Sequence, residues 1–65
     1  MPDPRLRATD REDLEDAKLL LGSAVGNARA ALIGDELEDA LRNAEKAAEQ
    51  ALTAIRRVRE RVVGP

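Results

Sequence analysis

The 65-residue sequence contains no cysteine, no histidine and no aromatic residue. The absence of cysteine excludes disulfides and thiolate metal sites, and the absence of histidine removes the commonest zinc ligand and the usual general base. No apolar run approaches the roughly 20 residues that span a bilayer. Folds this small usually need disulfides, a metal or oligomerisation to be stable. Of these three sources of stability, oligomerisation is the one left to this chain.

Charges of opposite sign nearly balance, with 11 Lys and Arg against 13 Asp and Glu and a net charge of −2. No global field therefore attracts nucleic acid or an anionic membrane. Apolar residues make up 43% of the chain, and alanine supplies much of that share. Alanine has the highest helix propensity but buries only a methyl group, worth roughly 0.8 kcal/mol. We expect an all-α, soluble cytoplasmic protein with no membrane association.

Proline and capping residues mark the start of the first helix. Residues 1–8 hold two of the three prolines and show no periodicity, so we expect a flexible leader before a single helical domain over 9–65. Thr9 and Glu12 match a capping box, in which a Thr hydroxyl and a Glu carboxylate satisfy free backbone N–H groups. The first helix is therefore predicted over about 10–33.

Gly34 decides between a hairpin and one long helix. Glycine readily adopts the left-handed conformation that ends a helix, and Asp35 follows as a cap for a second helix over about 36–63. Folding back at Gly34 also places the acidic residues 1–16 beside the arginine-rich residues 50–65. These signals favour an antiparallel helical hairpin. One continuous helix in an extended coiled coil is the alternative.

Apolar residues at alternating spacings of three and four give each helix a stripe that faces the other helix. Ala40, Ala47 and Ala54 widen the stripe of the second helix on one flank. The larger side chains are expected at the centre of the contact. The predicted core inside the hairpin consists of Leu14, Leu21, Ala28, Leu37, Leu41, Ala48, Ile55 and Val58.

The far side of the first helix carries a second stripe, which needs a neighbour from another molecule. This predicted oligomer interface consists of Leu19, Gly22, Gly26, Ala30 and Ile33. Glycines four residues apart allow close approach of another backbone, whereas a kink or break at these glycines is the alternative. We predict that the hairpin self-associates into a four-helix bundle, first of all as a homodimer. Higher oligomers and docking onto another helical protein are the alternatives.

The alanine seams and the hairpin layout resemble those of small dimeric four-helix proteins such as the Rop-type plasmid copy-number regulators. The resemblance covers the two helices and implies a dimeric bundle. It includes no functional motif. Those proteins bind RNA through basic residues and an aromatic residue on their first helix. This first helix is acidic at its start and has no aromatic residue.

The remaining candidate site is a cluster of arginines near the end of the chain. A possible nucleic-acid contact would use Arg56, Arg57, Arg59 and Arg61. The acidic first turn should neutralise much of this charge, and no aromatic side chain offers a stacking platform, which argues against nucleic acid. No catalytic, cofactor or metal motif is present. The sequence thus predicts a non-enzymatic interaction or oligomerisation module, a small adaptor or regulator, with a small nucleic-acid-binding regulator as the alternative.

Overall fold

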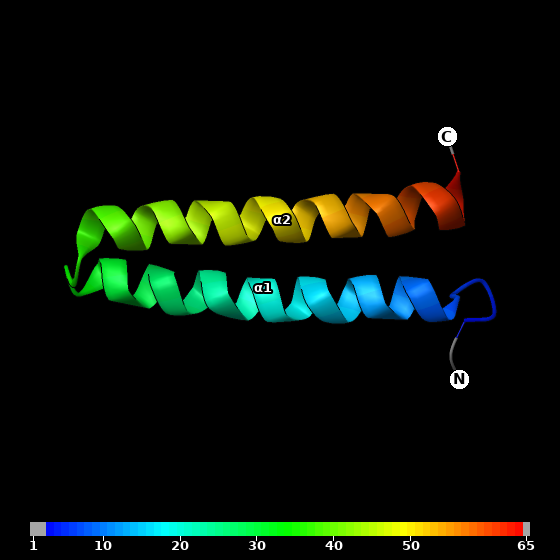
Figure 1. The fold of residues 1–65 in the computed structure, drawn as a ribbon, viewed down its shortest axis with the longest axis horizontal. Helices are drawn as coiled ribbons and strands as arrows, with labels where there is room; N and C mark the ends of the chain where they lie inside the picture. Colours follow the sequence, from blue (N-terminus) through cyan, green and yellow to red (C-terminus); the bar gives the residue numbers. More distant parts are fainter. Residues whose placement is uncertain (1–2, 65) are drawn as a thin grey trace.

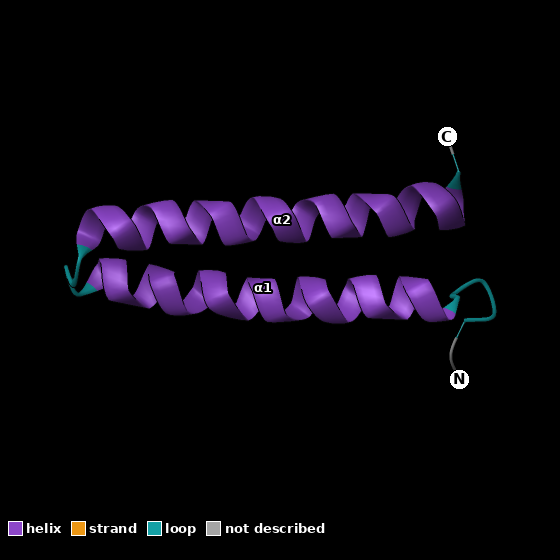
Figure 2. Cartoon of the chain, in the orientation of Figure 1, coloured by secondary structure: helices purple, strands orange, loops and turns teal. Residues whose placement is uncertain are grey.

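Two antiparallel α-helices make up the fold of the computed structural model, which describes residues 3–64 (Figures 1 and 2). Helix α1 spans Ala8–Leu32 and helix α2 spans Leu37–Val63, and the part of the chain described holds no strand. The helices run side by side along their whole length, so the start of α1 and the end of α2 lie at the same end of the hairpin (Figure 1). The hairpin is thereby confirmed over the continuous helix. The outermost residues of the predicted leader and domain, 1–2 and 65, lie outside the described residues.

The turn between the helices depends on Gly34, as predicted. Gly34 has a φ of 74° and donates its N–H to the carbonyl of Ala31 at 3.0 Å. The N–H of Asp35 reaches back to the carbonyl of Ala30, also at 3.0 Å. These two bonds form a Schellman motif, which satisfies carbonyls that the end of a helix otherwise leaves free.

Helix α2 begins differently from the prediction. Asp35 does not cap it; the capping position is Glu36, whose φ of 45° is left-handed and whose side chain makes no capping hydrogen bond. The helix therefore starts at Leu37, one residue later than predicted. Glu36 is thus the second left-handed residue of the turn, after Gly34, and it completes the reversal of the chain. For a residue with a Cβ atom this conformation costs roughly 1–2 kcal/mol.

Helix α1 begins two residues earlier than predicted, and Thr9 is not its cap. The capping position is Arg7, whose N–H donates to the carboxylate of Asp10 at 2.9 Å. Asp10 thus has the reciprocal role that was predicted for Glu12. The same carboxylate binds Arg61 of α2, and this contact between helices fixes the start of α1.

The core between the helices is made of small side chains. Among residues 3–64 its buried apolar members are Ala17, Ala40, Ala47, Ala51, Ala54 and Val58. Ala51 is fully inaccessible, with Ala17, Ala54 and Leu20 packed around it. Alanine at the contact allows the backbones to approach closely, which a row of leucines would prevent.

This core corrects the prediction for the inside of the hairpin. Of the eight residues expected there, only Val58 is buried, and the other seven are exposed at the edge of the contact: Leu14, Leu21, Ala28, Leu37, Leu41, Ala48 and Ile55. The alanines expected on the flank of α2 lie at its centre. The physical reason is the close approach of the backbones, which places the larger side chains beside the contact.

The glycines of the turn and of α1 should respond oppositely to alanine. Gly34→Ala forces a Cβ atom into a left-handed residue and is expected to lower the free energy of unfolding by about 1–2 kcal/mol. Gly22→Ala is the matched control: it meets no atom within 4 Å and should raise the free energy by about 1 kcal/mol through helix propensity. Urea unfolding followed by far-ultraviolet circular dichroism measures both, and a shift in the same direction would contradict this account.

Candidate interaction surface

Seven residues that were predicted to lie inside the hairpin instead form an apolar face shared by both helices. We call this set the apolar face: Leu14, Leu21, Ala28, Leu37, Leu41, Ala48 and Ile55. All seven are exposed, and Leu41 keeps 55% of its surface accessible. A face to which two helices contribute large aliphatic side chains has the character of an interface.

A groove runs through the part of the apolar face nearest the turn. It has a volume of about 480 Å³, and its lining is formed by Ala28, Ala31, Leu32, Leu37, Leu41 and Ala44. All of these side chains are aliphatic, and Leu32 at its edge is 86% exposed. The groove therefore offers no polar group that would orient a small polar substrate, and it suits another aliphatic side chain.

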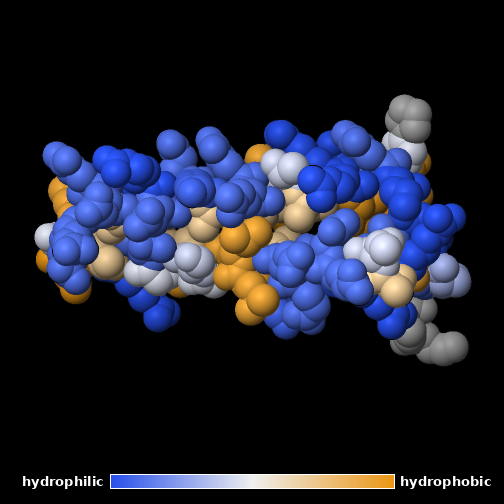
Figure 3. All heavy atoms as spheres, viewed as in Figure 1, coloured by the Kyte–Doolittle hydropathy of each residue, from blue (hydrophilic) through white to orange (hydrophobic). Residues whose placement is uncertain are grey.

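The other long side of the hairpin carries more polar side chains. A second groove between the helices is lined by five polar and two apolar residues: Asp13, Asp16, Leu20, Gln50, Thr53, Ala54 and Arg57. Figure 3 shows a side of the molecule on which hydrophilic side chains predominate around a central hydrophobic patch. The exposed large apolar side chains are therefore not spread evenly around the hairpin.

Helix geometry explains why the two sides differ. The central line of α1 runs through Ala17, Ala24 and Ala31, at seven-residue steps. Around Ala17, for example, one side of this line holds the residues at positions 14 and 21, three before and four after it. The other side holds the residues at positions 13 and 20, four before and three after it. The first side carries only apolar residues, Leu14, Leu21 and Ala28, whereas the second side carries Asp13, Leu20 and Asn27.

The stripe predicted as the oligomer interface lies on the outward side of α1. We call it the outer stripe; its members are Leu19, Gly22, Gly26, Ala30 and Ile33. Leu19 is 68% exposed, and only Ala30 is partly buried. Helix α1 continues unbroken through both glycines, so the alternative of a break there is wrong. Apart from the adjacent residues and backbone of α1 itself, no heavy atom of residues 3–64 lies within 4 Å of a Cβ placed at either glycine.

An ion pair between Asp10 and Arg61, which we call the clamp, joins the first turn of α1 to the last turn of α2 at the open end of the hairpin. Asp10, only 3% exposed, accepts a hydrogen bond from Nε of Arg61 at 2.8 Å and pairs with the same guanidinium through its second oxygen. Arg61 also donates to the carbonyl of Arg5. The guanidinium, together with the N–H of Arg7, holds the pKa of Asp10 below its usual value. Sequence reasoning missed this pair because the partners lie 51 residues apart.

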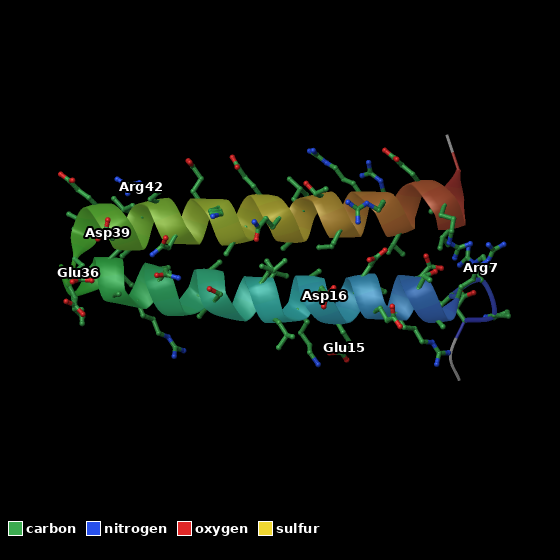
Figure 4. The ribbon with its side chains drawn as sticks, in the orientation of Figure 1. Arg7, Glu15, Asp16, Glu36, Asp39 and Arg42 are labelled. Carbon is green, nitrogen blue, oxygen red and sulfur yellow. The ribbon has the colours of Figure 1, made fainter. Side chains whose placement is uncertain are left out.

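The arginine cluster is divided by this clamp. Arg61 is paired with Asp10, whereas Arg56, Arg57 and Arg59 are exposed and form no ion pair with any residue in the range 3–64. The hairpin has acidic side chains at its other end: Glu36 and Asp39 lie beside the turn, far from the open end (Figure 4). The three exposed arginines share the open end with the acidic residues Glu12 and Asp13 of α1, so they do not form a uniformly basic surface.

The described part of the chain shows no arrangement suited to metal binding. Residues 3–64 contain no cluster of three or more Asp or Glu side chains that could hold a metal ion. Neither helix, over that range, has the length and apolar character needed to cross a membrane. Every buried side-chain N or O atom there has a hydrogen-bond partner. The apolar face is therefore the candidate functional surface.

No protein-family model matches the chain, and neither a curated protein nor a solved structure is significantly similar to it.

The clamp predicts a loss of stability in acid. Because the pKa of Asp10 is lowered in the folded chain, its contribution is present above the unfolded value near 3.8 and is lost as the pH falls through the folded value. Asp10→Asn should therefore be less stable than the parent at neutral pH, and the difference should shrink on acidification. Asp16→Asn, at an exposed aspartate, is the control. Urea unfolding at several pH values tests this; a difference that is constant with pH would exclude the clamp.

Proposed function

We propose that this chain is a non-enzymatic protein–protein interaction module that acts by self-association through the apolar face. The observation that carries the proposal is the distribution of apolar side chains. The hairpin buries alanines and one valine between its helices and leaves four leucines and Ile55 exposed on one shared face. The core of the single chain is therefore made of its smaller apolar side chains, and the larger ones on this face remain exposed to a partner.

The energetics of the hairpin support association. Each buried alanine methyl contributes roughly 0.8 kcal/mol, whereas ordering a residue costs about 1.5 kcal/mol of conformational entropy. Burying a Leu or Ile side chain fully is worth roughly 1.5–3 kcal/mol, and the apolar face holds five of them, each at least partly exposed. These five side chains keep between 36% and 55% of their surface exposed in the hairpin, so covering the face would add roughly half of that value for each of them.

The apolar face supports this role better than the outer stripe does. Both helices contribute to the face, and its groove can receive an aliphatic side chain from a partner. The outer stripe comes from α1 alone, and two of its five members are glycines, which have no side chain to bury. The outer stripe remains the competing interface and can be tested with a matched substitution.

Two lysine substitutions separate the surfaces. Leu41→Lys places a charge in the apolar face and should convert the oligomer to a monomer, weakening association at least tenfold because the ammonium group would lose its hydration among aliphatic side chains. Leu19→Lys is the control, since Leu19 is similarly exposed but belongs to the outer stripe. Absolute mass by light scattering behind a sizing column, with refractive-index detection, measures both over a range of concentrations.

Gly26→Leu completes the comparison. It adds a bulky side chain to the outer stripe, where the hairpin offers open space, and should leave the oligomeric mass unchanged. If Gly26→Leu or Leu19→Lys disperses the oligomer while Leu41→Lys does not, the outer stripe is the interface. A parent chain that stays folded and monomeric at all concentrations would exclude self-association and leave the face for a different helical protein.

A further inference from the structure

We infer that the occupant of the apolar face is a second copy of this chain turned end for end, so that each turn lies beside the open end of its partner. This inference rests on the proposed function and adds the orientation of the partner. It follows from the charged residues that border the apolar face. These residues distinguish the two ways in which identical hairpins can stack face to face.

The two stackings differ in which helices meet. A two-fold axis parallel to the helices puts both turns at the same end and packs α1 of one copy on α2 of the other. A two-fold axis perpendicular to the helices puts the turns at opposite ends. It then packs α1 on α1 and α2 on α2, each pair antiparallel. Both arrangements are closed and bury the same face twice.

The α1 border row consists of Arg11, Lys18, Val25 and Leu32, each of which lies three residues before or four residues after Leu14, Leu21 or Ala28. The α2 border row consists of Glu38, Glu45, Leu52 and Arg59, each of which lies three residues before or four residues after Leu41, Ala48 or Ile55. All eight residues are exposed. The border of the face is therefore cationic toward the open end, while its anions lie on α2 toward the turn.

End-for-end stacking brings opposite charges together. On α2, Leu41 and Ile55 each lie seven residues from Ala48, so an axis at Ala48 matches the two larger side chains with each other across the interface. The same axis brings Glu38 of each copy to the level of Arg59 in the other, within about one residue. Neither residue forms an ion pair within the described chain, so both are available for this contact.

Helix α1 satisfies the same axis independently. Leu21 lies at about the level of Ala48, since the chain reverses between Leu32, the last residue of α1, and Leu37, the first residue of α2. Leu14 and Ala28 each lie seven residues from Leu21, so a leucine meets an alanine on both sides of the axis. The cations of the α1 border row then lie over the apolar members of the same row, which their aliphatic stems can cover.

Stacking in the same direction gives the opposite result. It brings Arg11 of one copy to the level of Arg59 in the other, twice per dimer, because α1 of one copy then covers α2 of the other. It also places Leu32 against Glu38. The two arginines repel each other across the interface, and in this stacking no pair of opposite charges in the border rows offsets that repulsion.

Charge reversal at Arg59 distinguishes the two stackings by sign. Arg59→Glu should weaken dimerisation about tenfold at low salt if the copies stack end for end, and strengthen it if they stack in the same direction. Glu38→Arg combined with Arg59→Glu in one chain should restore the affinity of the parent. Arg57→Glu, an equal change of charge beside the polar groove, is the control and should have little effect.

Cross-linking gives a second, independent readout, since the chain has no cysteine of its own. Ala48→Cys lies at the expected axis and should form a disulfide with itself under mild oxidation, as should Leu21→Cys. Stacking in the same direction would instead join the two variants to each other when they are mixed. Mass spectrometry identifies the products.

The possible results separate this inference from the function on which it rests. A dimer that is weakened by Arg59→Glu, restored by the double change and cross-linked at Ala48→Cys supports it. A dimer that is strengthened by Arg59→Glu, with cross-links only in the mixture of variants, overturns the orientation and leaves self-association in place. A parent chain that is monomeric in light scattering overturns both.

Discussion

The seam of alanines between α1 and α2 is the contact on which the rest of the structure depends. Ala51 is inaccessible, and its neighbours on both helices are small, so the backbones lie close together. That closeness decides where every larger apolar side chain can go. Leucines that would occupy the centre of a wider hairpin are displaced to its edge, where they form a continuous face. The separation between a fold made of small residues and a surface made of large ones follows from this single constraint.

The two ends of the hairpin hold the seam in register by different means. At the turn, Gly34 and Glu36 are both left-handed, and backbone hydrogen bonds close the end of α1. At the open end, the carboxylate of Asp10 receives the N–H of Arg7 and the guanidinium of Arg61, so one side chain caps α1 and ties it to α2. Because both ends are fixed, the border residues of the two helices keep a defined level relative to one another.

The sequence was sufficient to predict the two helices, their antiparallel arrangement and the stop at Gly34, because these depend on local signals. The centre of the helix contact could not be predicted in the same way. In α2, Ala40 and Leu41 belong to adjacent stripes with the same seven-residue spacing, and periodicity alone does not choose between them. Assigning the larger side chain to the core follows the energy of burial but neglects the close approach that alanine allows. The role of Asp10 was missed because it depends on a residue at the other end of the chain.

The proposed association would be coupled to folding. The contact inside the hairpin buries little apolar area, so the population of folded hairpin depends strongly on anything that binds the folded form alone. A partner that covers the apolar face stabilises the seam, and the seam in turn holds Leu41 and Ile55 at the spacing the partner requires. The border charges add little energy individually, but their order along each helix makes one orientation of a second copy compatible and the other repulsive. Small residues thus define the hairpin, and in the proposed dimer large residues would supply the driving force for association and charged residues would select the orientation of the second copy.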